Sequence, residues 1–269
     1  MSSMPSPSAL FRNIVGHRAM IWALALRDLE SRYAGTMGGA LWAFAHPLAV
    51  VVIFYFVFAV GFRAQGPANA PFILWFVGGL VPWFFFNETL TAISKSITSN
   101  AHLVKKTIFP TETLPFVHLV SGVFPHAVFL LILVGMLVFF GVPLVIDRFA
   151  FVYFFVCSCI LLLGLGWLFA ALQVFYRDIG QGLTIILNLW FWITPIVWSP
   201  DIMPPEYRSL LFYNPIYYIV EGYRGVLIFE TITWPGAAAT AYFWSVTTLC
   251  FLAGSYTFRR LKPEFPDVM

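Results

Sequence analysis

The sequence holds few residues arranged for bond-making chemistry. Lys95 and Lys106 are the only lysines followed by Ser or Thr, and no glycine precedes either, so the chain lacks the P-loop that binds nucleotide phosphates. It also lacks a G-x-S-x-G nucleophile motif and an H-E-x-x-H zinc motif. His118 and His126 share one apolar stretch, where packing or pore lining is favoured over metal binding. We therefore expect no catalytic residue, metal site or cofactor in this chain.

The composition indicates a membrane protein. Of the 269 residues, 60% are hydrophobic and 10% are charged, and the mean hydropathy is +0.85. Soluble domains carry about 25% charged residues. The net charge of +3 is too small to indicate nucleic-acid binding. The three cysteines all lie in apolar stretches, which fits neither a disulfide framework nor a zinc site.

Six segments of 22 residues or more contain no Asp, Glu, Lys or Arg. A helix needs about 20 apolar residues to cross the hydrocarbon layer, and a charge at its centre is costly. The sequence therefore predicts an all-α integral membrane protein. Its six transmembrane helices are expected at roughly 40–62, 72–94, 113–140, 149–174, 180–198 and 236–258.

The basic residues lie mainly on one side of these spans. Of the 15 Lys and Arg residues, 11 fall in segment 1–39, in the loops after the second and fourth spans, and in the tail 259–269. Cytoplasmic loops carry the excess of Lys and Arg. We therefore expect both termini in the cytoplasm, flanking a transmembrane domain over 40–258.

Segment 1–39 has the pattern of a helix on the membrane surface. Between residues 10 and 32, leucine and isoleucine alternate at helical spacing with arginine and acidic residues, which predicts an amphipathic interface helix. Gly35, Gly38 and Gly39 then favour a break that turns the chain into the bilayer.

The cytoplasmic loop at about 95–110 mixes lysines with the apolar residues Ile97, Leu103 and Val104. One interpretation is a short helix that docks into a groove on another protein, with its lysines facing acidic residues. The other is a plain basic turn.

The outer segment 199–233 is too apolar for a solvated loop. Two short helices are predicted, at about 204–212 and 216–229, on either side of an Asn214–Pro215 break that a helix cannot continue through. Neither is long enough to span, so we interpret the segment as a re-entrant hairpin packed against the spans, or else as an interfacial aromatic loop. Glu221 and Arg224 lie three residues apart and are expected to pair.

Aromatic residues cluster within the spans, at positions 83–86 and 190–192. Such residues most often pack between helices. Sugar rings also stack their apolar C–H faces on aromatic planes, so an aromatic-lined passage for carbohydrate is a second interpretation.

Short motifs occur in order along almost the whole chain. They comprise Arg27 to Trp42 followed by His46-Pro47-Leu48, Val81-Pro82-Trp83-Phe84, Lys105 to Pro110, Arg177-Asp178, Thr194-Pro195-Ile196, Asn214 to Arg224, and Leu261-Lys262-Pro263. Their order and spacing resemble the membrane subunits of polysaccharide ABC exporters, which carry lipid-linked O-antigen, capsule or teichoic acid. One departure is Glu30 with Ala34, where a basic residue is expected.

The resemblance implies a homodimer bound to two copies of a separate ATPase subunit, which would hold ATP and Mg²⁺. The loop 95–110 would be the coupling helix, contacting the ATPase through Asn100, His102, Leu103, Lys105 and Lys106. The outer hairpin would be a gate, with Asn214, Pro215, Tyr217, Tyr218, Glu221 and Arg224 as its residues. A passage between the two copies would be lined by Trp42, Trp83, Phe84, Phe85, Trp190 and Trp192.

Arg27 and Arg32 are expected near the inner mouth of that passage. Guanidinium groups bind phosphate bidentately, so this pair is a candidate site for the lipid pyrophosphate, with ordinary positive-inside anchoring as the alternative. We expect export of lipid-linked polysaccharide, O-antigen above capsule or teichoic acid, across a bacterial inner membrane. An ABC permease for drugs or other lipids, and a membrane enzyme acting on lipid-linked sugars, remain alternatives.

Overall fold

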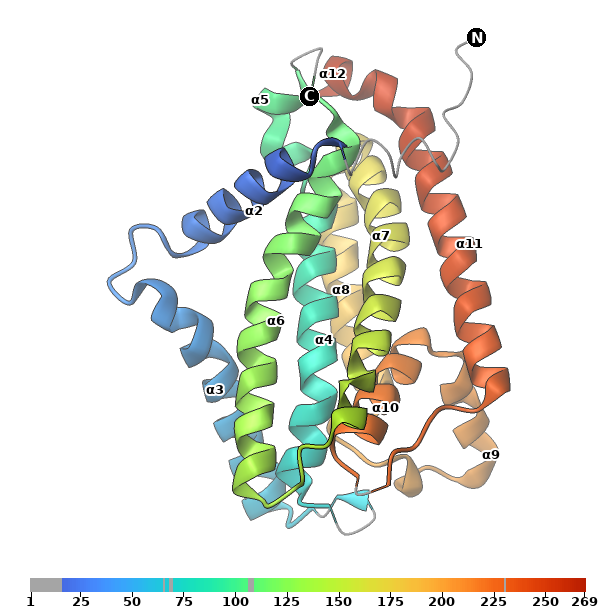
Figure 1. The fold of residues 1–269 in the computed structure, drawn as a ribbon. Coiled ribbons are helices and arrows are strands. Elements are labelled where there is room, and N and C mark those ends of the chain that lie inside the picture. Colours follow the sequence, from blue (N-terminus) through green and yellow to red (C-terminus); the bar gives the residue numbers. More distant parts are fainter. Residues whose placement is uncertain (1–15, 65, 68–69, 106–108, 230) are drawn as a thin grey trace.

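The computed structural model describes residues 16–64, 66–67, 70–105, 109–229 and 231–269. Every regular element in these ranges is helical, which confirms the predicted all-α class. Figure 1 shows a bundle built from α4 (Phe72–Ser94), α6 (Leu114–Phe139), α7 (Phe151–Phe175) and α11 (Ala237–Leu261). Helix α3 (Trp42–Phe54), which continues as a π-helix over Tyr55–Gly61, flanks the bundle beside α6.

Five helical segments are long and apolar enough to cross a membrane, and they match five of the six predicted spans. They are Phe44–Gly61, Phe72–Ser94, Thr111–Phe139, Ile146–Phe175 and Ala237–Val268. The remaining predicted span, 180–198, corresponds to α8 (Asp178–Ile193), whose 16 residues extend only about 24 Å. Helix α8 ends early because Pro195 lacks an amide hydrogen and disfavours helical backbone at the residue before it.

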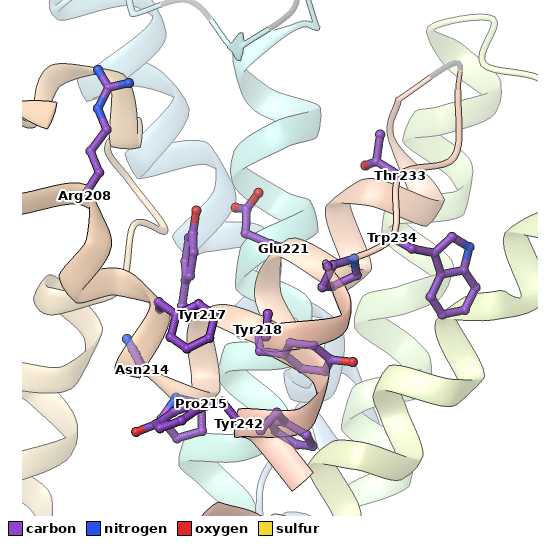
Figure 2. Close-up of a pocket in the computed structure, with 14 residues that line it drawn as sticks. Arg208, Asn214, Pro215, Tyr217, Tyr218, Glu221, Thr233, Trp234 and Tyr242 are labelled. Atoms are coloured by element: carbon purple, nitrogen blue, oxygen red, sulfur yellow. The ribbon is translucent and has the colours of Figure 1, made fainter. Parts of the chain in front are cut away.

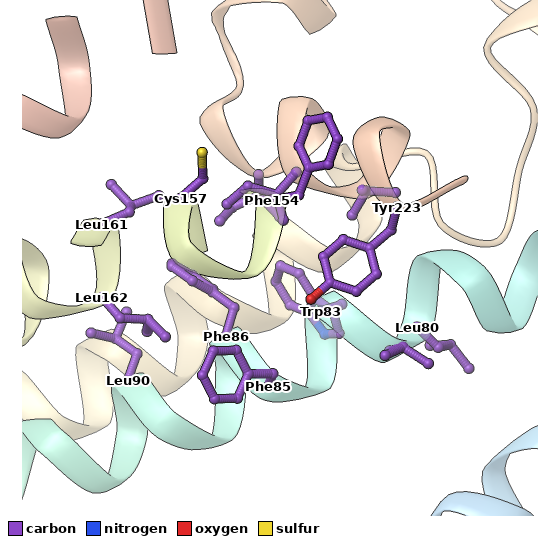
Figure 3. Packing of buried hydrophobic residues seen from close by; sticks show 14 of the residues in the cluster. Leu80, Trp83, Phe85, Phe86, Leu90, Phe154, Cys157, Leu161, Leu162 and Tyr223 are labelled. Carbon is purple, nitrogen blue, oxygen red and sulfur yellow. The ribbon is translucent and has the colours of Figure 1, made fainter. Parts of the chain in front are cut away.

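Helix α4 is the centre of the bundle. It packs against α6, α7 and α10 (Pro215–Leu227), and 83% of the residues in its most apolar stretch are buried within the chain. A helix that is apolar on every side is expected to be buried in this way. Figure 3 shows Trp83 and Phe86 of α4 in one cluster with Phe154 and Leu161 of α7. In contrast, only 11% of the residues in Phe44–Gly61, which covers most of α3 and the π-helix after it, are buried. This segment therefore leaves most of its apolar surface uncovered.

Helices α7 and α11 approach closely at a pair of glycines. A Cβ atom added to Gly254 would overlap the backbone carbonyl of Gly164. Small residues at a helix crossing allow such contact within a membrane. The crossing fixes α11, and with it the C-terminal elements, against the bundle.

Helix α2 (Arg18–Tyr33) packs across α6 through Ile21 and Ala25. The part of the predicted amphipathic helix before residue 16 lies outside the described residues. After α2 the chain turns at Gly35 and Gly39, whose φ angles of +76° and +48° are left-handed and favour glycine. The predicted glycine break is therefore confirmed.

Candidate functional site

The segment predicted as the outer hairpin forms two short helical segments joined at Asn214. Helix α9 (Pro205–Arg208) and the 3₁₀ turn Ser209–Tyr213 come before the break, and α10 begins at Pro215. The Asn214 side chain accepts the backbone N–H of Ile216 at 3.0 Å, which caps α10. The predicted break and both short helices are confirmed.

Asn214 also connects the hairpin to the end of α8. Its Oδ1 accepts the indole N–H of Trp190 at 2.9 Å, and its Nδ2 donates to Thr194 Oγ1 at 2.9 Å. The amide therefore uses both of its polar atoms to hold two segments together. Of the predicted passage residues, Trp190 is thus placed in a hydrogen bond with Asn214 of the predicted gate.

Arg224 holds α10 within the bundle. Its guanidinium is fully buried and pairs with Glu221 at 2.8 Å, as the spacing predicts. It also donates to the carbonyl oxygens of Trp75 at 3.0 Å, Pro195 at 2.7 Å and Ile196 at 2.9 Å. The guanidinium carbon lies 3.6 Å from the centroid of the Trp75 ring, a cation–π contact. Arg224 therefore joins α10, α4 and the segment after α8.

Arg148 is a second buried arginine at this end, and its role was not predicted. It donates to Pro143 O at 2.7 Å, and to the carbonyls of Val226 at 3.2 Å and Leu227 at the C-terminus of α10. These carbonyls have no partner within the helix, and a cation there also interacts favourably with the helix dipole. The only sequence signal was a charge directly before a long apolar span.

Five of the six predicted gate residues line one cavity of about 340 Å³ between α10, α11 and the loop before α11. They are Asn214, Pro215, Tyr217, Tyr218 and Glu221, and Figure 2 shows their side chains grouped in this cavity. Arg224, the sixth, lies behind them in the core. The structure thus brings the predicted gate residues together at the end of the bundle opposite the C-terminus (Figure 1).

The predicted passage aromatics divide into two groups. Trp83 and Phe85 are 4% and 3% exposed and pack in the core, against Phe191 and against His126 with Phe155 respectively. We therefore reassign these two side chains from lining a passage to helix packing. Phe84 and Trp190 are partly buried.

Trp42 and Trp192 remain available for the predicted lining, because each is 56% exposed on the surface of the chain.

The segment predicted as a coupling helix is a 3₁₀ turn over Thr98–Asn100 followed by the short helix α5 (Ala101–Val104). Ile97 and Val104 are buried in the core of this chain, so the apolar side faces inward. His102 and Lys105 are exposed, whereas Leu103 is half-buried. Asn100 is half-buried too, and its side chain donates to Ser96 O at 2.9 Å.

Lys106 lies outside the described residues, so its prediction stays untested.

The C-terminal segment packs beside α5, which the sequence did not predict. Helix α11 leads into the 3₁₀ turn Lys262–Glu264 and helix α12 (Phe265–Val268), which contacts α5 and α7. Phe265 is fully buried against Phe175 and Phe258, and Lys262 forms an ion pair with Glu112 before α6. The tail therefore braces the same end of the bundle that presents His102 and Lys105.

A polar cluster fastens α2 to α6. Asp28 accepts the hydroxyl of Ser121 at 2.7 Å, lies 3.4 Å from His118 Nδ1, and pairs with Arg32 at 2.9 Å. Burial raises the pKa of the Asp28 carboxyl. The hydrogen bonds with His118 and Ser121 and the charges of His118 and Arg32 lower it by more, so the pKa lies below its ordinary 3.8. Arg27 is exposed, and no ion pair involves it within the described ranges.

The Asp28→Asn variant is expected to loosen α2. A charged hydrogen-bonding group contributes about 1.5–3 kcal/mol, so amide exchange in α2 should rise by about ten-fold or more while α4 is unchanged. Because the folded pKa is lowered, the contribution is complete above the unfolded value near 3.8, declines below it, and is lost as the pH falls through the lower folded pKa. Hydrogen exchange at pH 6 and pH 3 checks this, and equal exchange in both proteins at pH 6 would contradict it.

In the part of the chain that the structure describes, no three His, Cys, Asp or Glu side chains gather as they do around a metal ion. The arrangement instead consists of apolar helices joined at both ends by hydrogen bonds and ion pairs.

Comparison with known proteins identifies the class. The family model for ABC-2 type transporters matches residues 19–228, and the chain belongs to this family of membrane subunits. It is 27% identical to the O-antigen export system permease protein RfbA of Klebsiella pneumoniae, covering 90% of this chain and 92% of the relative. It is 27% identical to RfbA of Myxococcus xanthus, with 96% and 98% covered. The polysialic acid transport protein KpsM of Escherichia coli is 25% identical, with 76% and 79% covered.

Proposed function

We propose that this chain is the membrane subunit of an ATP-driven exporter that moves lipid-linked polysaccharide, most specifically O-antigen, out of the cytoplasm. The observation that carries the proposal is similarity over almost the full length to permeases named for O-antigen export. Capsular polysaccharide is the second candidate, supported by the similarity to KpsM over a smaller share of the chain. In this account the protein resides in a bacterial inner membrane with both termini cytoplasmic.

The uncovered apolar surfaces support assembly as a homodimer with the passage between the copies. Most of α3 is exposed, and one face of α8 exposes Ile185, Leu189 and Ile193. Trp42 is the first residue of α3 and Trp192 lies in the last turn of α8, and a second copy would place these exposed side chains along a shared passage. Their indole planes offer stacking surfaces for sugar rings.

The cytoplasmic end supports docking of a separate ATPase subunit, which would bind ATP and Mg²⁺. The α5 segment is anchored by its buried apolar side and by α12 of the tail, so a push on its exposed side would be transmitted to α4 through the chain and to α7 through α12. His102 and Lys105 supply the exposed polar contacts. A separate ATPase fits a sequence without a phosphate-binding loop.

Arg27 is proposed to bind the lipid diphosphate together with Arg32, whose guanidinium is shared with Asp28. The double variant Arg27→Ala, Arg32→Ala should reduce export at least about ten-fold with normal insertion, since each charged hydrogen bond contributes about 1.5–3 kcal/mol. The matched controls are Arg18→Ala, an exposed arginine of the same helix, and Asp28→Asn, which loosens α2 but keeps both arginines. Export at the normal rate by the double variant would remove this site.

Co-purification tests the proposal. Isolation of the tagged chain from its own cells should recover an ABC ATPase subunit in a 1:1 ratio, together with lipid-linked glycan. A stable chain that recovers glycan-processing activity but no ATPase would favour the membrane enzyme. Recovery of the ATPase with stimulation by drugs or simple lipids, and not by glycan, would favour the small-molecule permease.

A further inference from the structure

The cavity beside α10 has an aromatic wall that is open on one side. Trp234 packs one side of its ring toward Tyr153 and Phe154, with centroids 5.7 and 5.4 Å apart, yet remains 55% exposed. Tyr242 of α11 also lines the cavity, as do Tyr217 and Tyr218 of α10 (Figure 2). The volume of about 340 Å³ lies within the ~300–1,000 Å³ typical of small-molecule sites.

Polar groups with unused bonding capacity face the same cavity. Glu221 binds Arg224 through Oε1, and its Oε2 forms no hydrogen bond within the described residues. The hydroxyls of Tyr217 and Thr233, which also line the cavity, likewise form none within that part of the chain. The cavity therefore offers one acceptor and two hydroxyls beside open aromatic faces.

The charges at the cavity cancel. Its two charged lining residues in the described chain are Glu221, paired with Arg224 at 2.8 Å, and Arg208, which lies 3.5 Å from Asp201. Arg208 also donates to the backbone carbonyls of Asp201 and Met203. A phosphate or a carboxylated sugar would need an unpaired cation, because an anion next to the Glu221 carboxylate is repelled.

We propose that this cavity binds uncharged sugar rings of the glycan on the outer side of the membrane. A hexose presents an apolar C–H face to Trp234 and hydroxyls to Glu221, Tyr217 and Thr233. The placement on the outer side rests on the proposed function. The inference goes beyond it by selecting neutral glycans over polyanions such as polysialic acid, and by giving the gate a holding site separate from the passage.

The test measures binding of defined trisaccharides to the purified complex by saturation-transfer NMR and titration. Neutral trisaccharides of glucose, mannose, galactose and N-acetylglucosamine are compared with a sialic acid trimer of the same length. At least one neutral probe should bind and the sialic acid trimer should not. Trp234→Ala should weaken that binding about ten-fold or more. Trp234→Phe keeps an aromatic face and should retain the affinity within about three-fold. It thereby separates loss of the aromatic contact from misfolding.

Tyr207→Ala is the matched control, because Tyr207 is exposed on α9 but does not line the cavity. Its binding should equal that of the unmodified chain. The inference is overturned if no neutral probe binds up to millimolar concentration, if the sialic acid trimer binds as tightly, or if Trp234→Ala binds normally. Export is measured separately: intact ATP-driven export without sugar binding rejects the cavity alone, whereas sugar binding without ATP-driven export rejects the proposed function.

Discussion

Replacing Arg224 with methionine is expected to lower the free energy of unfolding by about 3–5 kcal/mol, the range for breaking a buried ion pair. The reason is geometric. Methionine fills a similar volume but leaves the carbonyls of Trp75, Pro195 and Ile196 without a donor and Glu221 without its cation. Unfolding of the purified complex in detergent, followed by tryptophan fluorescence, measures the change.

Three companion variants separate the causes. Arg224→Lys keeps the charge but cannot reproduce the planar fork, so it should recover only part of the loss. Adding Glu221→Gln to Arg224→Met should also recover only part, because the three carbonyls stay unpaired. Arg208→Met, an exposed arginine of the same hairpin, should cost less than about 1 kcal/mol. An Arg224→Met protein as stable as the Arg208→Met protein would contradict the central role of Arg224.

Reversing the charges at the proposed ATPase-docking end, with Lys105→Glu and Lys106→Glu, is expected to reduce ATP-coupled export at least about ten-fold, since like charges across an interface cost several kcal/mol. The chain itself should fold normally, because Ile97 and Val104 anchor the segment and Lys105 is exposed. The readouts are ATP hydrolysis and glycan transport in the same vesicles.

Lys95→Glu is the control for this variant, because Lys95 is an exposed lysine at the end of α4 and is not one of the predicted ATPase contacts. It should retain transport within about two-fold, as surface charge changes away from contacts have small effects. Full coupling in the Lys105→Glu, Lys106→Glu protein would show that the ATPase binds elsewhere.

Charge spacing predicted the helices well because a charge near the middle of the bilayer is costly. It overestimated how far α8 extends toward residue 198, because a segment without charged residues need not be helical along its whole length. Pro195 was the signal that would have placed the end at Ile193. The hairpin break was predictable for the same reason, since Asn214–Pro215 acts through local backbone chemistry.

The direction of individual side chains was not predictable from the pattern. Helix α4 is apolar on every side, so periodicity does not tell that Trp83 and Phe85 face the core while Trp42 on α3 remains exposed. The Lys262–Glu112 ion pair joins residues 150 positions apart, so no local spacing in the sequence predicts it. Asp28 and Arg32, four apart on one helix, did carry a readable signal for their pairing.

Transport by purified components tests the central claim most directly. Vesicles containing this chain and its ATPase subunit are loaded with lipid-linked glycan on the outer leaflet, where the ATPase also faces, and accessibility of the glycan to an external glycosidase is followed. We predict that the glycan becomes protected only when both subunits, ATP and Mg²⁺ are present. Protection by this chain alone, or none with the complete set, would contradict the account.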